Sequence, residues 1–190
     1  MTRYRRTRDE IVLIGPPAAG KSTVARILSE LVSRPCVVLD DASWRYYYEI
    51  GYDAAVVDRL LASAGFAAVY RHWKPYEAHA VARVFQEHRD CVFDLGAGNA
   101  CFADELLLAE VKAAFAPFRH VVLLLPSRDP ERAVEILRRR RPAEASVGVD
   151  LYDHFVRHPS SFELATHVVV TEERTERETC AEILRLTRGT

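Results

Sequence analysis

Several features that define common protein classes are missing from this sequence. No apolar run approaches the roughly 20 residues that a transmembrane helix requires, and no signal peptide heads the chain. Basic residues are not in excess: 26 lysines and arginines face 27 aspartates and glutamates, for a formal net charge of -1. A dedicated nucleic-acid-binding protein usually carries a basic surplus. We therefore expect a cytoplasmic protein without membrane association, and we do not expect nucleic acid as a partner.

Cysteine is scarce, and zinc-binding motifs are missing. The four cysteines show no Cys-x-x-Cys spacing. Cys36 and Cys91 lie in or beside predicted strands, and Cys180 falls among the apolar positions of the last predicted helix. This placement predicts buried, reduced thiols. No His-Glu-x-x-His motif is present, so no zinc site is predicted. Nothing in the sequence specifies an oligomeric state.

What the chain does contain is one complete phosphate-binding motif. Residues 15–23 read Gly-Pro-Pro-Ala-Ala-Gly-Lys-Ser-Thr and meet the pattern G-x-x-x-x-G-K-[ST] in full. The apolar run 11–14 precedes it, and a segment with helical periodicity follows, with apolar residues at 24, 27, 28, 31 and 32. This strand–loop–helix setting is the one in which a P-loop works. A plain connecting turn would need neither the lysine nor two consecutive hydroxyls.

The chemistry of a P-loop explains these residue types. A tight turn without bulky side chains lets backbone N–H groups converge on a polyphosphate, at the positive end of the following helix. We expect Lys21 to reach the β- and γ-phosphates and the Ser22 hydroxyl to ligate Mg²⁺. The predicted nucleotide-binding residues are Gly15, Ala18, Ala19, Gly20, Lys21, Ser22 and Thr23, and the predicted cofactors are ATP and Mg²⁺.

Apolar strands alternate with amphipathic helices along the whole chain. The predicted strands cover 11–14, 36–39, 91–95, 120–125 and 167–170. Continuous apolar strands indicate a sheet that is covered on both faces. We therefore predict an α/β fold with three layers: a doubly wound, five-stranded parallel sheet with helices on both faces, forming one domain over residues 1–190. Between residues 71 and 91 we expect a helix that begins near Pro75 and ends near His88.

Several polar residues follow the predicted strands directly. In open parallel sheets, ligands bind beyond the carboxyl ends of the strands, so these residues should share one cleft with the P-loop. Asp40 and Asp41 follow the second strand, and Asp94 stands at the end of the third. Asp40 and Asp94 are the candidate Mg²⁺ carboxylates together with Ser22. Helix capping remains an alternative role for Asp41, and capping or a turn for Asp94.

Taken in order, these motifs resemble those of the shikimate kinase branch of the small P-loop kinases, over nearly the whole length. Besides the P-loop, the matching features are Asp41, Tyr70-Arg71, Gly96-Ala97-Gly98 in place of a three-glycine turn, Arg141-Pro142, and Arg157-His158-Pro159. The resemblance implies that Asp41 orients or deprotonates an acceptor hydroxyl. It also implies that Arg71, Arg157 and the turn residues Gly96, Ala97 and Gly98 bind the acceptor, and that Arg141 begins the lid. We assign Arg141 to ATP or to the transferring phosphate, and a solvated surface position remains an alternative for Arg71 and Arg157.

The same resemblance implies a lid at about residues 141–157 and an acceptor-side segment at about 41–89. Departures from the family pattern are concentrated on the acceptor side. Ala97 replaces the middle glycine, the segment after Asp41 is unusually aromatic, and Asp40 is displaced by one position. We therefore expect a phosphotransferase that moves the γ-phosphate of ATP to a hydroxyl of a small metabolite. Shikimate, a nucleoside, an aminocyclitol and an antibiotic-like compound remain alternative acceptors, and a non-catalytic ATP-dependent switch or binding module remains an alternative function.

Overall fold

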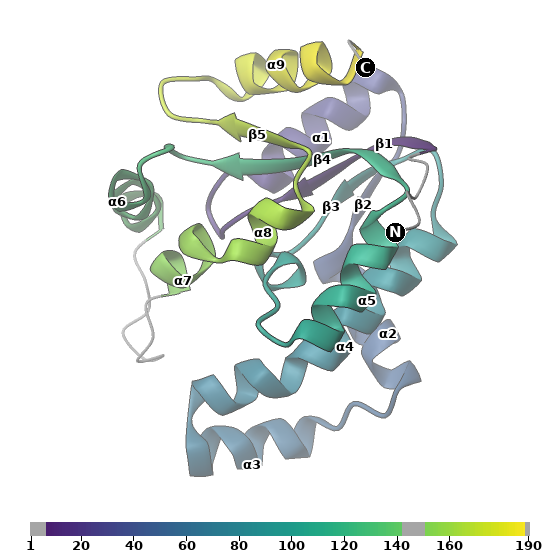
Figure 1. Cartoon of the computed structure of the whole chain (residues 1–190), viewed down its shortest axis with the longest axis vertical. Helices are drawn as coiled ribbons and strands as arrows, with labels where there is room; N and C mark the ends of the chain where they lie inside the picture. Colours follow the sequence, from purple (N-terminus) through teal and green to yellow (C-terminus); the bar gives the residue numbers. More distant parts are fainter. Residues whose placement is uncertain (1–6, 142–150, 189–190) are drawn as a thin grey trace.

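A parallel five-stranded sheet forms the centre of the molecule (Figure 1). The computed structural model describes residues 7–141 and 151–188. The strands are β1 (Arg8–Ile14), β2 (Cys36–Val38), β3 (Val92–Asp94), β4 (Phe118–Leu125) and β5 (His167–Val170), in the spatial order β2-β3-β1-β4-β5. All four pairings are parallel, which confirms the predicted fold class. Most of the expected lid, residues 142–150, lies outside the described residues.

Helices cover both faces of this sheet. On one face lie α1 (Lys21–Val32) and α9 (Glu176–Arg188); on the other lie α4 (Phe66–Glu87), α5 (Glu105–Phe115) and α8 (Pro159–Leu164). Side chains alternate along β1, so Ile11 and Leu13 enter one apolar cluster while Val12 and Ile14 enter the other. Burial on both faces explains why the strands read as continuous apolar runs.

Local sequence signals fix several helix starts as expected. Asp53 caps α3 (Ala54–Ala64), and its carboxylate accepts from the Ala55 N–H. Asp129 caps α6 (Pro130–Arg140), which has proline in its first turn. Thr175 and Glu178 exchange hydrogen bonds in the predicted capping box at the start of α9. The short helix expected near residue 152 is α7 (Leu151–Arg157).

The start of α4 was predicted wrongly. The helix begins at Phe66, so Pro75 lies inside it. Proline removes one backbone hydrogen bond, in this case the bond to the Arg71 carbonyl, and it is normally found in the first turn. Tertiary packing outweighs that local preference, because α4 buries eight residues between positions 69 and 85. Although α4 is the longest helix, no helix in the described ranges is long and apolar enough to cross a membrane.

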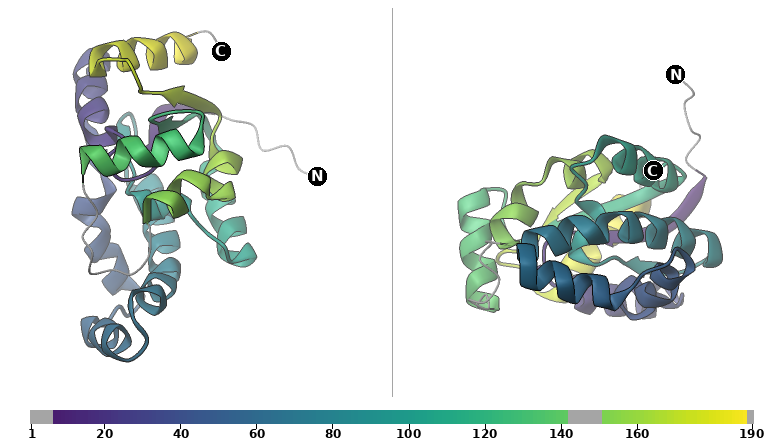
Figure 2. Two further views of the ribbon diagram at one scale, coloured as in Figure 1. Left: turned by 90° about the vertical axis from the view of Figure 1, so that its left-hand side faces the viewer. Right: turned by 90° about the horizontal axis from the view of Figure 1, so that it is seen from below.

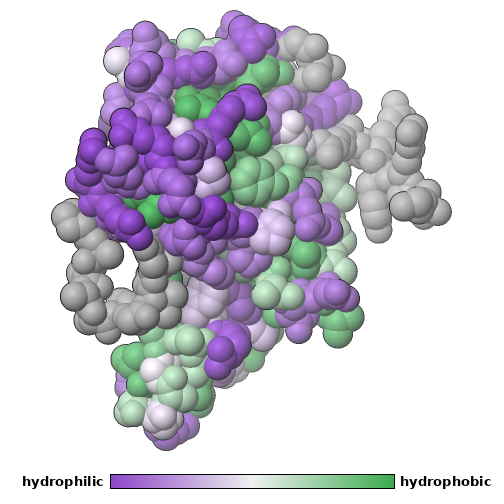
Figure 3. Space-filling view, turned by 60° about the vertical axis from the view of Figure 1, so that its left-hand side comes forward, coloured by the Kyte–Doolittle hydropathy of each residue, from purple (hydrophilic) through white to green (hydrophobic). Residues whose placement is uncertain are grey.

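The aromatic segment after β2 is divided between core and surface. It forms α2 (Leu39–Glu49), in which Tyr46 and Tyr47 are buried while Trp44 and Tyr48 are exposed. The following helix, α3, buries no residue and projects from the body of the molecule together with the first turns of α4 (Figure 2). The surface of this projection is markedly less polar than the arginine-rich region of α6 (Figure 3).

Candidate active site

The P-loop connects β1 to α1 with the backbone conformations that its glycines allow. Gly15 has a φ of 140°, and a Cβ there would overlap the Leu124 carbonyl oxygen on β4. Gly20 has a φ of 94° and is the N-cap of α1, with no side chain capping the helix. The first N–H groups of α1 are therefore left for a ligand at the loop. Ala18 is a non-glycine residue with positive φ, 60°.

Lys21 lies inside this loop. Its ammonium donates to the Gly15 and Pro16 carbonyl oxygens, both at 2.9 Å, and only 8% of the residue is exposed. Burial lowers the pKa of Lys21, while the nearby carboxylates of Asp94 and Asp40 oppose that shift. The lysine therefore stands between the loop and two acidic side chains.

Asp94 ends β3 in register with Leu13, which places it beside the P-loop. Burial raises the pKa of the Asp94 carboxyl, and a hydrogen bond from Ser22 together with the charge of Lys21 partly offsets the rise. A hydroxyl and a carboxylate in contact suit Mg²⁺, which in phosphotransferases takes one or two carboxylates and completes its shell with phosphate and water. No group of three His, Cys, Asp or Glu side chains in the described chain could hold a metal alone. The residues present therefore fit a Mg²⁺ ion that arrives with a phosphate.

Asp40 and Asp41 both lie in the first turn of α2 rather than in a loop, and Val38 is the N-cap of that helix. A Cβ on Gly96 would overlap the Asp40 carboxylate, so Asp40 lies directly over the turn. Partial burial, with Asp94 and Asp41 nearby, raises the pKa of Asp40, and Lys21 opposes this. Both residues are exposed, and Asp41 adds to the effect of burial and of Asp94 in raising the pKa of Cys36. Asp40 is therefore the carboxylate nearer to both Lys21 and the glycine turn.

A buried ion pair that the sequence analysis missed lies against Gly98 of that turn. Lys74 and Glu77 are 2.5 Å apart on α4, with 7% and 8% of their surfaces exposed. Lys74 also donates to the Gly98 carbonyl oxygen at 3.0 Å and lies 4.0 Å from the centre of the Tyr70 ring. Burial raises the pKa of Glu77, which Lys74 opposes and Asp40 reinforces.

Asn99 follows the turn in the short 3₁₀ helix η1 (Ala97–Ala100). It is 4% exposed, and its Oδ1 has no hydrogen-bond partner among residues 7–141 and 151–188. Its Nδ2 lies 2.8 Å from the position of a Cβ on Gly96. Buried polar atoms are usually paired, so Asn99 offers an unused acceptor beside Asp40.

The two predicted acceptor arginines are exposed, unlike this buried pair. Arg71 is exposed and lines a cavity of about 190 Å³ with Tyr70 and His154. Arg157 is exposed and forms ion pairs with Asp153, at 2.7 Å, and with Glu131 on α6. Its guanidinium is therefore directed toward α6.

In the arginine run that ends α6, the side chain that reaches the P-loop belongs to Arg140. Its Nη1 donates to the Ala18 carbonyl oxygen at 3.4 Å and to Thr171 Oγ1 at 3.5 Å. Arg141 is the C-cap residue of α6, and its carbonyl oxygen accepts from the Tyr152 hydroxyl at 2.6 Å. The side chain of Arg141 makes no hydrogen bond to the P-loop within the described residues.

His154 and His158 have the His-x-x-x-His spacing on and after α7, a pair that the sequence analysis overlooked when it predicted no zinc site. Their rings lie 5.0 Å apart. His154 Nε2 pairs with the Tyr70 hydroxyl at 3.0 Å, and His158 Nδ1 pairs with Ser160 at 2.8 Å. Each ring thus has a hydrogen-bonding role, and burial lowers both pKa values, that of His158 to about 4.

A sequence signal for the missed pair did exist. Lys74 and Glu77 are three residues apart, which places them on one helix face. Because the predicted helix began near Pro75, Lys74 fell outside it and Glu77 inside it. The contact of Arg140 with the P-loop has no such signal, because the direction of each arginine depends on how α6 packs.

Comparisons with known proteins agree with this geometry at the level of the fold. No family model matches the sequence, and no curated protein matches it. Among solved structures, shikimate kinase from Acinetobacter baumannii in complex with shikimate matches with a TM-score of 0.64 and 23% identity, covering 97% of this chain and 95% of that chain. Shikimate kinase from Aquifex aeolicus gives 0.58 and 20%, covering 95% and 96%. A gluconokinase from Sinorhizobium meliloti gives 0.51 and 15%, covering 97% and 96%. The chain therefore has the α/β fold of small, shikimate kinase-like P-loop kinases.

Proposed function

We propose that this protein is an ATP- and Mg²⁺-dependent phosphotransferase that moves the γ-phosphate to a hydroxyl of a small metabolite. One arrangement carries the proposal. Asp40 and the Gly96–Gly98 turn lie near both Lys21 in the P-loop and the buried pair of Lys74 and Glu77. A phosphate donor and a polar acceptor bound at these two places would meet at Asp40.

The donor side uses the chain's own cations and amides. Lys21 is held against the Gly15 and Pro16 carbonyl oxygens of the loop, and its charge would act on the β- and γ-phosphates there. Arg140 adds a second cation at the edge of the loop. Ser22 and Asp94 would hold Mg²⁺, which supplies neutralisation of phosphate charge when bound. Arg141 remains a candidate for the arginine that acts on the transferring phosphate, and Arg140 is a second candidate for the same role.

On the acceptor side, Asp40 is the better placed carboxylate to orient or accept the proton of the attacking hydroxyl. Its carboxylate lies against Gly96 and its charge acts on both Lys21 and Glu77, whereas the charge of Asp41 acts on Cys36 and Asp94. A raised pKa favours proton acceptance, because a general base works best when its pKa approaches the operating pH. We therefore assign the acceptor hydroxyl to Asp40, with Asp41 as the alternative that the family resemblance suggests.

The chemistry of the acceptor follows from Lys74 and Glu77. Because the two charges neutralise each other, the pair presents one donor and one acceptor rather than a net positive charge. Together with Asn99 Oδ1 it suits adjacent hydroxyl or amino groups. A polyhydroxylated ring, as in shikimate, a nucleoside or an aminocyclitol, matches this set. The free cysteines agree with a reducing compartment, and we propose that the reaction takes place in the cytoplasm.

Release of ADP from Mg·ATP in the presence of single candidate acceptors tests the proposal. Shikimate, gluconate, nucleosides and aminocyclitols form the panel. Lys21→Ala should abolish release with every compound, whereas Asn99→Ala should raise KM for the acceptor and leave KM for ATP unchanged. Tight ATP binding without stimulation by any polyhydroxylated compound would contradict the proposal and favour the ATP-dependent switch.

A further inference from the structure

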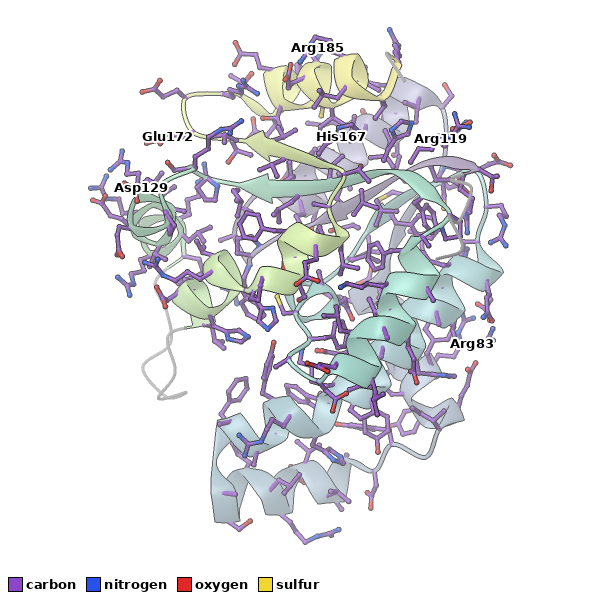
Figure 4. All side chains as sticks on the ribbon, in the orientation of Figure 1. Arg83, Arg119, Asp129, His167, Glu172 and Arg185 are labelled. Atoms are coloured by element: carbon purple, nitrogen blue, oxygen red, sulfur yellow. The ribbon has the colours of Figure 1, made fainter. Side chains whose placement is uncertain are left out.

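A cavity of about 470 Å³ lies at the end of the sheet opposite the P-loop. It is bounded by the starts of β1, β3 and β4 and by the final residues of α1 and α9. Figure 4 shows this separation: Arg119, which lines the cavity, lies at one end of the sheet, and Asp129 and Glu172 lie at the other. The cavity is therefore distinct from the nucleotide and acceptor region. Its volume falls within the range of roughly 300–1,000 Å³ found for small-molecule sites.

The cavity is lined by an excess of positive charge. Arg34, Arg119 and Arg188 line it, and Asp9 is its one carboxylate among the described lining residues. Arg119 lies 3.4 Å from Asp9. Arg34 and Arg188 form no ion pair with any residue in the ranges 7–141 and 151–188. Two arginines thus line one cavity without an ion-pair partner in the described chain, although arginine is well suited to bind oxyanions through paired N–H groups.

The ends of helices explain part of this arrangement. Arg34 follows the last turn of α1 and Arg188 ends α9, where a cation interacts favourably with the helix dipole. That interaction does not explain His120 on β4. His120 is 4% exposed and lines the cavity, and its Nδ1 has no hydrogen-bond partner in the described structure. Buried polar atoms are usually paired, so the ring of His120 is a second unusual feature of this cavity.

The floor of the cavity is apolar. Ile11 and Val92 are buried strand residues there, and Leu184 of α9 covers the same region. An inorganic ion alone would leave that surface unused. A compound with an oxyanion at one end and an apolar body at the other would contact both the arginines and the floor.

We propose that this cavity binds a small organic oxyanion, a phosphate or carboxylate carrying an apolar body, between Arg34, Arg188 and the floor of β1 and β3. The site is independent of the phosphotransfer reaction. β1 and α1, which border it, are the two elements that hold the P-loop at their other ends.

Calorimetric titration with phenyl phosphate tests the site, and inorganic phosphate serves as the probe without an apolar body. Arg34→Ala and Arg188→Ala should each weaken phenyl phosphate binding about tenfold, the loss expected for one charge-assisted hydrogen bond. Arg185→Ala is the matched control on the same helix, because Arg185 is exposed and pairs with Glu182. Lys21→Ala removes the phosphate site of the P-loop and should leave this binding unchanged. Inorganic phosphate should bind more weakly than phenyl phosphate.

A second readout reports on His120 directly. The ring-proton NMR signal of His120, identified with His120→Asn, should shift during the phenyl phosphate titration in wild type and Arg185→Ala but not in Arg34→Ala. Circular dichroism of each variant distinguishes loss of binding from loss of folding. The proposal is overturned by undetectable phenyl phosphate binding, by loss of binding in Lys21→Ala, by equal affinity in Arg34→Ala and wild type, or by an unmoved His120 signal.

Discussion

The carboxylate of Glu77 fills the space that a side chain on Gly98 would need. A Cβ on Gly98 would overlap Glu77 Oε1 and lie 3.0 Å from its Cδ, while Lys74 holds the same carboxylate and the Gly98 carbonyl together. The turn and the buried ion pair therefore depend on each other. In physical terms, glycine is needed here for close approach, because Gly98 does not have a positive φ.

Replacing Gly98 by alanine should disturb the pair rather than the backbone. Overpacking a filled site costs roughly 1–3 kcal/mol, so Gly98→Ala should lower the free energy of unfolding by that amount. In a Lys74→Met/Glu77→Ala background the same change should cost much less, because the obstructing carboxylate is gone. Urea unfolding of the four proteins measures the coupling. Equal costs in both backgrounds would show that Glu77 does not occupy this space.

Breaking the Lys74–Glu77 ion pair should destabilise the protein, whereas replacing both charged side chains should change its stability little. Lys74→Met leaves the Glu77 carboxylate buried without its partner and should cost about 3–5 kcal/mol at neutral pH. Lys74→Met/Glu77→Gln removes both charges and should recover most of that loss. Chemical denaturation of the single and double variants decides this. A double variant as unstable as the single one would rule out charge burial as the cause.

Arg140 should matter more for turnover than its neighbours. It contacts the Ala18 carbonyl, whereas Arg139 pairs with Glu135 on the outer face of α6. Loss of one preorganised charge at a transferring phosphate lowers kcat by about 10²–10³. We expect that loss for Arg140→Ala and less than a threefold change for the control Arg139→Ala. Arg141→Ala, measured beside them, tests the assignment made from the sequence. A loss of about 10²–10³ in kcat for Arg141→Ala with no loss for Arg140→Ala would show that Arg141, not Arg140, acts on the phosphate.

Stability should fall in mildly acidic solution because of His158. The folded protein keeps this ring neutral with a pKa of about 4, while the unfolded chain protonates it near 6.5. Protons then bind preferentially to the unfolded chain, so the free energy of unfolding should decrease as the pH falls from about 6.5 to about 4. The full shift corresponds to about 3 kcal/mol.

His158→Asn keeps a polar group near Ser160 and should flatten that part of the stability profile. Thermal unfolding at matched pH values between 4 and 7 provides the comparison. An identical slope in wild type and variant would assign the acid sensitivity to other groups.

The sequence predicted the P-loop, the strands and several helix starts correctly, because the signals for these elements are local. The P-loop motif, the apolar strands and the caps at Asp53, Asp129 and Thr175 each depend on residues close together in the chain. The alternation of strands and helices then allows few topologies. The parallel sheet and the three-layer arrangement follow from these constraints, whereas the strand order was not predicted.

The acceptor side could not be predicted in the same way. Lys74 meets Gly98 across 24 residues, and α4 continues through Pro75 only because tertiary packing outweighs the local preference. The resemblance drew attention to Arg71, three residues earlier on the same helix, which is exposed. Which of Asp40 and Asp41 faces the turn depends on where α2 begins, and element boundaries are the least certain part of a sequence pattern.

The central claim is that the main-chain amides of residues 15–23 and Lys21 bind the phosphates of a nucleotide. Isothermal titration calorimetry with Mg·ATP and Mg·ADP tests it most directly, using Lys21→Ala and the distant Arg185→Ala as the paired variants. We predict saturable binding of one nucleotide per chain in wild type and Arg185→Ala, with a large loss of affinity in Lys21→Ala. Absence of binding in wild type, or equal affinity in all three proteins, would contradict the account.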